Sequence, residues 1–179
     1  MRARLFRGLL HRWERRVPEI LRRIQLQILM NLTAKAFRAP AERLWTRPWR
    51  EGLSVYVEYT RKCAQIMDTD PERLYALSFA LGERLRRIAG FTEDDDLCRL
   101  VFWLYRGIGI DMGGRLPGAV TVSGCFFSDY YTPDVCALIS NMDSGIVGGI
   151  MGGGRLVFSG RITEGAGGCR ACLVRGRGQ

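Results

Sequence analysis

The sequence predicts an α+β fold in which N-terminal helices pack with a C-terminal β-α-β-β antiparallel unit. Two observations predict this class. Before Gly113, apolar residues recur at steps of three and four, which is the period of an amphipathic helix. After Gly114, runs rich in Val, Thr and aromatic residues alternate with glycine-rich turns, which is typical of strands. The chain has 179 residues, so we expect one α+β domain over residues 49–179, preceded by a basic helical extension over residues 1–48.

The first 50 residues hold the positive charge of the chain. They carry 13 Lys and Arg against three Glu, a balance of +10, whereas the whole chain has a net charge of +9. This segment could meet an acidic partner, an anionic membrane surface or nucleic acid by simple electrostatics, but a solvated helix face is the favoured interpretation. It contains no DNA-reading motif, so we expect no specific binding of nucleic acid.

An amphipathic helix is predicted near the N-terminus, and Pro18 bends or divides it. We expect its apolar stripe to pack into the core with the arginines outside; a partner-binding arm is the alternative. The stripe consists of Leu5, Leu9, Trp13, Val17, Ile20, Ile24 and Ile28.

Further helices are predicted over about 51–67, from Asp70 to Gly90, and from Thr92 to Tyr105. Asp70-Pro71-Glu72 has the order of an N-cap, a first helical position and a first-turn carboxylate, and Gly90 is a C-terminal stop. Thr92 with Asp95 forms an imperfect capping box. The buried stripe expected for the middle helix consists of Leu74, Leu77, Leu81, Leu85 and Ile88.

The C-terminal unit is expected over residues 116–175. A strand is predicted from Leu116 to Phe127. Thr132-Pro133 then opens a helix over 133–147, which the glycines from Gly148 onward should end. Two more strands, 155–163 and 169–175, are joined by a glycine-rich turn.

Cysteine and histidine usage limits the chemistry. The single His11 is far in sequence from the C-terminal unit, so a Ser-His-Asp or Cys-His pair inside that unit is excluded. Four cysteines, at 125, 136, 169 and 172, lack the paired spacing of a zinc ribbon, so we predict no metal. The glycine runs do not follow a strand and open a helix, and no cofactor is expected.

The start of the chain lacks the continuous apolar stretch of a secretory signal, and no apolar run approaches the length that spans a bilayer. These features predict a cytoplasmic protein without a transmembrane segment, whose thiols are reduced.

Three charged residues of the C-terminal unit are candidate site residues. Asp143 falls on a largely apolar helix, where a carboxylate is either a tuned acid or base or a solvated surface residue. Arg161 could clamp a substrate carboxylate with its planar guanidinium, or could pair with Glu164 at the mouth of the turn.

The spaced residues of this unit resemble the L-2-amino-thiazoline-4-carboxylic acid hydrolase family. The resemblance covers about 55 residues and rests on Cys125-Phe-Phe-x-x-Tyr-Tyr-Thr-Pro-x-Val-Cys136, Met142-Asp143, Gly153-Gly-x-Leu-x-Phe158, Arg161-Ile-Thr-Glu-Gly165 and Cys169.

The same layout is similar to the four-vinyl-reductase domain, which binds small molecules. Sensors of that type hold a structural zinc, but only Cys136 and Cys169 fall at ligand positions here. The other two positions land near Phe158 and Arg161, which cannot complete such a site.

The first resemblance implies a hydrolase-like enzyme acting on a small cyclic C–N substrate, such as an aminothiazoline carboxylate. Cys125 or Cys169 would then be the nucleophile and Asp143 the acid, base or amidinium partner. Arg161, Tyr130 and Glu164 would bind the substrate.

Two other classes of function stay open. One is a non-catalytic module that binds or senses a small-molecule ligand. The other is an assembly subunit, including a homo-oligomer, with an exposed interface around Trp45 and Trp49.

Overall fold

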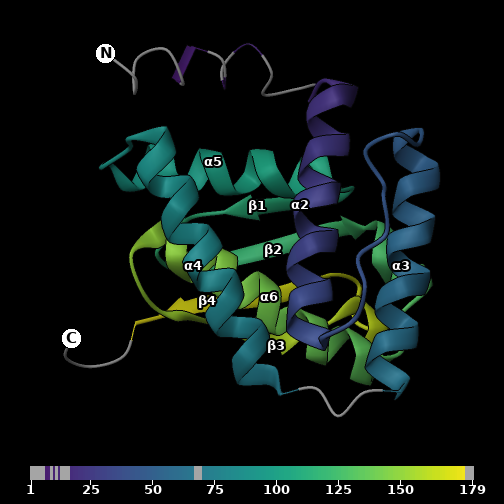
Figure 1. The fold of residues 1–179 in the computed structure, drawn as a ribbon. Helices are drawn as coiled ribbons and strands as arrows, with labels where there is room; N and C mark the ends of the chain where they lie inside the picture. The colour runs from purple at the N-terminus through teal and green to yellow at the C-terminus, as the bar shows by residue number, and fades with distance from the viewer. Residues whose placement is uncertain (1–6, 9, 11, 13–16, 67–69, 176–179) are drawn as a thin grey trace.

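The computed structural model describes residues 17–66 and 70–175, together with residues 7, 8, 10 and 12. The predicted α+β class is confirmed, with helices first and an antiparallel sheet after them (Figure 1). The elements are α2 (Glu19–Phe37), α3 (Trp49–Ile66), α4 (Pro71–Ala89), α5 (Asp94–Gly107), β1 (Ile110–Gly114), β2 (Ala119–Cys125), the 3₁₀ turn η1 (Phe126–Asp129), α6 (Pro133–Met151), β3 (Arg155–Gly160), the 3₁₀ turn η2 (Ile162–Glu164) and β4 (Cys169–Val174).

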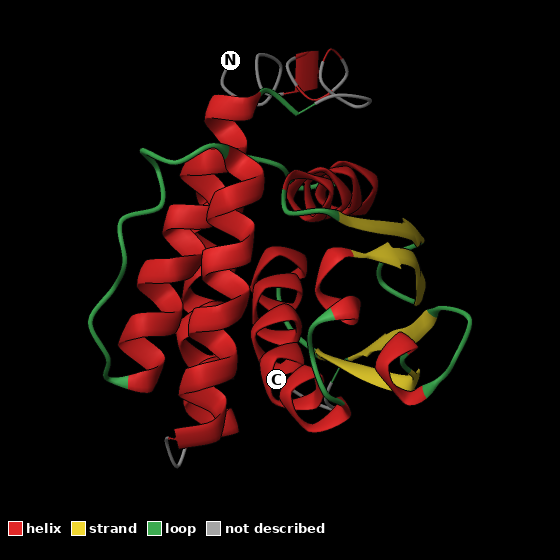
Figure 2. Cartoon of the chain, turned by 90° about the vertical axis from the view of Figure 1, so that its right-hand side faces the viewer, coloured by secondary structure: helices red, strands yellow, loops and turns green. Residues whose placement is uncertain are grey.

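The sheet has the strand order β1-β2-β4-β3, and all neighbouring strands are antiparallel. Burial alternates along the strands, because successive side chains point to opposite faces. Val120 and Val122 of β2 and Ala171 and Leu173 of β4 are buried, whereas Cys172 is exposed. One face therefore packs on the helices, and the long helices all lie on that side (Figure 2).

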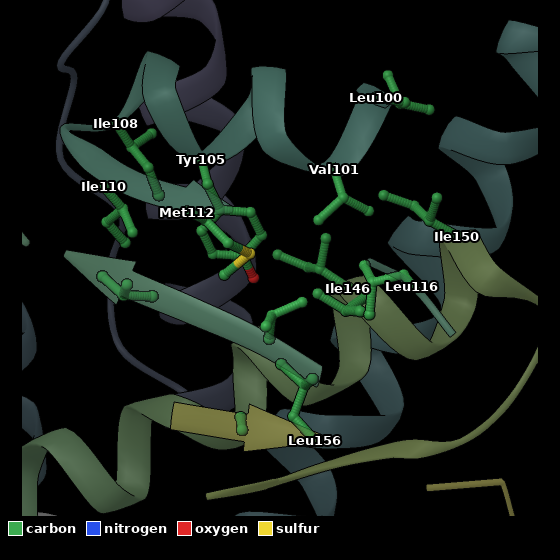
Figure 3. Close-up of a cluster of buried hydrophobic side chains, with 14 of the residues drawn as sticks. Leu100, Val101, Tyr105, Ile108, Ile110, Met112, Leu116, Ile146, Ile150 and Leu156 are labelled. Atoms are coloured by element: carbon green, nitrogen blue, oxygen red, sulfur yellow. The ribbon is translucent and has the colours of Figure 1, made fainter. Parts of the chain in front are cut away.

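The core lies between this face of the sheet and the helices α5 and α6. Figure 3 shows side chains from α5, β1, α6 and β3 meeting there. The labelled members are Leu100, Val101, Tyr105, Ile108, Ile110, Met112, Leu116, Ile146, Ile150 and Leu156.

Helix α6 is the centre of the molecule, because it packs on α3, α4, α5 and β3. Its contact with α4 depends on glycines. A Cβ atom at Gly145 would lie 2.4 Å from the carbonyl oxygen of Tyr75, and one at Gly149 would lie 2.2 Å from that of Phe79. On the α4 side, a Cβ atom at Gly82 would lie 2.4 Å from the carbonyl oxygen of Ile146. The two backbones are thus in contact without side chains between them.

Glycine positions also explain why the predicted end of α6 is wrong. Gly148 and Gly149, the predicted stop, lie inside the helix, and Gly152 is the cap at φ +80°. Glycine lowers helix propensity, but the close approach to α4 requires it at Gly149, and a Cβ atom at Gly148 would lie 2.3 Å from the Gly154 carbonyl oxygen.

Helix α2 contributes to the core through a different face from the predicted one. Leu26 and Met30 are buried with residues of the sheet and of α5, and Phe37 is buried in a smaller cluster. Three members of the predicted stripe, Ile20, Ile24 and Ile28, are instead exposed, whereas Val17 is buried. Leu5, Leu9, Trp13 and His11 lie outside the described residues.

The sheet contains a strand that the sequence did not reveal, and this strand lies before the predicted C-terminal unit. Strand β1 pairs with β2, so the predicted strand from Leu116 to Phe127 is only the second strand, and it gives way to η1 after Cys125. β1 is five residues long and ends in two glycines, so it has little of the β-branched character that marks a strand.

The predicted N-terminal caps form at α4 and α6 but not at α5. The Asp70 side chain accepts a hydrogen bond from the Glu72 N–H at 2.9 Å, and Gly90 ends α4 in the left-handed conformation at φ +68°. The capping box expected at Thr92 is not formed, because α5 begins at Asp94 after Glu93, which makes no side-chain cap. In the described part of the chain, no helix combines the length and apolar character needed to cross a bilayer.

The Trp45 and Trp49 region is only partly exposed. Trp45 is exposed, but the Trp49 indole N–H donates to the Gly107 carbonyl oxygen at 3.0 Å, and the Arg22 guanidinium lies 4.5 Å from its ring centroid. The exposed two-tryptophan interface predicted for an assembly subunit is therefore wrong at Trp49, which ties α3 to α5.

Candidate functional site

A cavity of about 350 Å³, here called the central cavity, lies among the helices and reaches the edge of the sheet. Apolar side chains form most of its wall. The lining residues are Leu21, Ile24, Gln25, Ile28, Leu29, Tyr56, Leu81, Leu85, Trp103, Leu104, Tyr105, Ile108, Ile110, Cys125, Phe127, Tyr131, Cys136, Ile139, Ser140, Met142, Asp143 and Ile146.

The exposed part of the wall of the central cavity belongs to α2, which packs beside α4. These helices run antiparallel, since the Arg73 guanidinium near the start of α4 donates to the Lys35 carbonyl oxygen near the end of α2 at 3.1 Å. Among the lining residues, Ile24 and Ile28 of α2 are exposed, by 45% and 39%. Two of the three isoleucines of α2 that do not enter the core, Ile24 and Ile28, thus form an exposed rim of the cavity.

Asp143 is the only carboxylate among the described residues that line the central cavity. It is placed by α6, which Thr132 caps through a hydrogen bond from the Val135 N–H at 3.4 Å. The Tyr105 hydroxyl donates to Asp143 Oδ1 at 3.0 Å. Burial raises the pKa of Asp143 to about 6, and this hydrogen bond offsets only part of the rise. Asp143 can therefore gain or lose a proton close to neutral pH.

The other ionisable groups of the cavity wall are acids that stay protonated. Burial raises the pKa of the Cys125 thiol to about 12, and burial also raises the pKa values of Cys136, Tyr56 and Tyr131. The negative charge of Asp143 contributes to each of these rises.

Two of the tyrosine hydroxyls are already occupied by helix partners. Tyr56 is hydrogen-bonded to Thr33 at 2.9 Å and Tyr131 to Thr60 at 2.5 Å. Asp143, with Tyr105 as its donor, is thus the carboxylate that can meet a bound molecule, and the Gln25 amide and the Trp103 indole N–H are further buried polar groups of the wall that have no hydrogen-bond partner among the described residues.

Four of the six predicted site residues lie away from the central cavity. The Arg161 guanidinium donates to Glu164 at 3.1 Å and lies 4.5 Å from the Phe158 ring centroid. Cys169 accepts a hydrogen bond from the Ile162 N–H at 3.4 Å, and Tyr130 is exposed with its ring 5.2 Å from that of Phe126. The structure therefore brings together Cys125 and Asp143 but places Arg161, Glu164, Cys169 and Tyr130 in or beside the η1 and η2 turns.

No protein-family model matches the sequence, and comparison with curated proteins and with solved structures finds no match. Within the described residues, no group of three or more His, Cys, Asp or Glu side chains is arranged to hold a metal ion.

Tyr105, Tyr56 and Tyr131 were missed as site residues. Tyr105 follows Leu97 and Val101 at four-residue spacing on α5, so the sequence pattern indicates only a core position. Its partner on α6 lies 38 residues further along the chain, and only the packing of the two helices brings the hydroxyl to the carboxylate.

Proposed function

We propose that this protein binds a small apolar molecule in the central cavity, as a binding or sensing module. The observation that carries the proposal is the cavity itself. Its volume of about 350 Å³ falls in the range of small-molecule sites, and its wall is apolar with very few polar groups, as in such sites.

The open cavity also leaves apolar side chains of its wall without packing partners, which is unfavourable because protein interiors are otherwise closely packed. An apolar molecule that fills it restores contacts and raises the free energy of unfolding, because it binds the folded state alone.

The test is a fluorescence titration with N-phenyl-1-naphthylamine, an apolar dye that is neutral at pH 7.5. We expect saturable binding to the natural protein. Cys136→Phe places a ring in the cavity wall and should weaken binding at least about tenfold. Cys172→Phe makes the same change on the exposed face of β4 and is the matched control.

Equal binding by all three proteins would place the dye outside the cavity and overturn the proposal. Because an added ring can also disturb packing, thermal melting of each variant accompanies the titration, and Ile139→Trp provides a second obstruction of the same wall.

A hydrolase-like activity on a small cyclic C–N substrate, such as an aminothiazoline carboxylate, is the second candidate. The observation that favours it is the pKa of Asp143, about 6, which suits a general base that activates water at neutral pH. A Cys125 nucleophile is less favourable, because its pKa of about 12 leaves only about one thiol in 10⁵ ionised at pH 7. Cys169 does not line the cavity, and Arg161 is engaged with Glu164.

The two candidates differ in turnover. If the protein is a hydrolase of this kind, Asp143→Asn should abolish release of the ring-opened product, while Cys125→Ala should retain most of it. If the natural protein gives no turnover of an aminothiazoline carboxylate although it binds the neutral dye, binding is the function of the site. Membership of the hydrolase or four-vinyl-reductase families stays a prediction from the spaced residues.

A further inference from the structure

The described wall of the central cavity can carry negative charge but no positive charge. Among the described residues of its wall there is no Arg, Lys or His, whereas Asp143 is a carboxylate. The other ionisable groups of the wall are Tyr56 from α3, Tyr105 from α5, Cys125 from β2, Tyr131 from the segment before α6, and Cys136 from α6, whereas the described wall residues of α2, α4 and β1 are not ionisable. These tyrosines and cysteines are acids that are neutral at neutral pH, so nothing in the wall offsets an ionised Asp143.

An ionised carboxylate in such surroundings is incompletely compensated. Tyr105 supplies a hydrogen bond but no positive charge. Buried charges are stable when they are paired, and a cation within a few ångströms of Asp143 would supply the missing pair. A ligand that brings its own positive charge into the cavity would therefore gain more there than a neutral ligand of the same shape.

A ligand with a negative charge would meet the opposite situation. Two carboxylates in an apolar cavity repel each other strongly, because the surroundings screen charge less than water does. Arg161, the clamp for a substrate carboxylate predicted from the sequence, is paired with Glu164 and does not line the cavity.

The volume sets the size of the ligand. A cavity of about 150 Å³ holds one benzene ring. The central cavity, at about 350 Å³, therefore has room for a two-ring apolar body with a short polar substituent.

We propose that the central cavity binds an apolar amine or amidine of about two rings in its protonated form, with Asp143 as the counter-ion. This inference rests on the proposed binding function and specifies its ligand class. The apolar body lies against the aliphatic wall, and the cationic end donates hydrogen bonds to the Asp143 carboxylate, whose other donor is Tyr105.

The test compares three ligands that share one ring system: 1-naphthylmethylamine, 1-naphthalenemethanol and 1-naphthoic acid. Their dissociation constants are measured by calorimetry with the full chain at about pH 7.5. We expect the amine to bind at least about tenfold more tightly than the alcohol, and the acid to bind most weakly. In Asp143→Asn, the advantage of the amine over the alcohol should fall to within about threefold, while the alcohol keeps its affinity, which shows that the cavity is intact.

Lowering the pH gives a second readout. At about pH 5, Asp143 of the unliganded protein is mostly protonated, since its pKa is about 6, whereas the amine stays charged. Binding of the amine should therefore weaken while binding of the alcohol is unchanged. The exposed carboxylate of Asp129 supplies the matched control, because Asp129→Asn should alter neither ligand's affinity.

The outcomes separate the two proposals. If the alcohol binds but the amine has no advantage, or if the advantage persists in Asp143→Asn, the amine proposal is wrong and the binding function stands. Tightest binding of the acid would likewise overturn the amine proposal alone. If none of the three ligands and no neutral dye binds, both proposals fail together.

Discussion

Asp143 should make the fold less stable at neutral pH than at acid pH. Its pKa is about 6 in the folded protein, against an ordinary value of 3.8, so the folded state binds more protons between these values. The free energy of unfolding therefore falls as pH rises from about 4 to 6, and above that range an ionised Asp143 costs roughly 1 to 3 kcal/mol.

Asp143→Asn removes this cost and keeps an acceptor for the Tyr105 hydroxyl. We expect the variant to be more stable than the natural protein by about 1 to 3 kcal/mol at pH 7.5, and the difference to shrink toward zero near pH 4. Urea unfolding at the two pH values measures it. Asp129→Asn, which makes the same change on an exposed carboxylate, is the matched control. If Asp143→Asn were destabilised equally at pH 7.5 and near pH 4, the ionised Asp143 carboxylate would not lower the free energy of unfolding, and its side chain would instead stabilise the fold.

For single residues, the sequence predicted part of the site. Asp143 could be singled out because a carboxylate on a largely apolar helix is unusual. The alternative interpretation of Arg161, an ion pair with Glu164, is the arrangement found, since the two are three residues apart across one 3₁₀ turn. Tyr105 could not be found in this way, because an aromatic residue in a helical stripe has the same signature whether or not its hydroxyl meets a distant carboxylate.

The contact between α4 and α6 should tolerate no added methyl group. Gly149→Ala improves helix propensity by up to about 1 kcal/mol, but its Cβ atom would lie 2.2 Å from the Phe79 carbonyl oxygen, which is backbone and cannot rotate away. The helices would have to separate, at a typical cost of about 1 to 3 kcal/mol for an overpacked core. We therefore expect net destabilisation, measured as a lower midpoint of urea unfolding.

The control for this change is Gly8→Ala, also on a helical residue but with no atom within 4 Å of the added Cβ atom. It should be neutral or slightly stabilising. If both substitutions stabilised the protein, the helices would not be as closely packed as the structure indicates.

Element boundaries were predictable where local chemistry sets them. The Asp70-Pro71 and Thr132-Pro133 starts and the Gly90 end depend on residues next to one another in the chain. Strand β1 and the last turn of α6 depend on distant partners. β1 exists because β2 offers a free edge, and of the glycines that the sequence pattern marks as a stop, Gly149 is required by the backbone of α4 and Gly148 by the backbone of Gly154. Secondary-structure propensity alone therefore cannot predict strand β1 or the last turn of α6.

For the whole molecule, α2 both completes the core and forms the rim of the central cavity. Leu26 is almost fully buried, whereas Ile20 is 59% exposed on the same helix. The charge-based division at residue 48 therefore does not follow the packing, because α2 contacts α3, α4 and α5. Helix α2, which belongs to the basic segment, therefore contributes both to the core and to the exposed rim of the cavity.

Removal of residues 1–36 should consequently abolish cooperative unfolding. The deletion takes away Leu26, Met30 and Ala34 from the buried interior and uncovers the apolar residues of α4 and α5 that α2 covers. Each large buried side chain contributes roughly 1.5 to 3 kcal/mol, against a net stability of about 5 to 15 kcal/mol for a domain. Two point variants locate the effect on the buried face: Leu26→Ala should cost about 2 to 5 kcal/mol, and Ile20→Ala less than about 0.5 kcal/mol. Thermal melting by circular dichroism measures all three proteins. A truncated chain that melts cooperatively near the melting temperature of the full protein would contradict this prediction and show that α2 is not needed for the core. The central cavity would then lack the side of its wall that α2 forms.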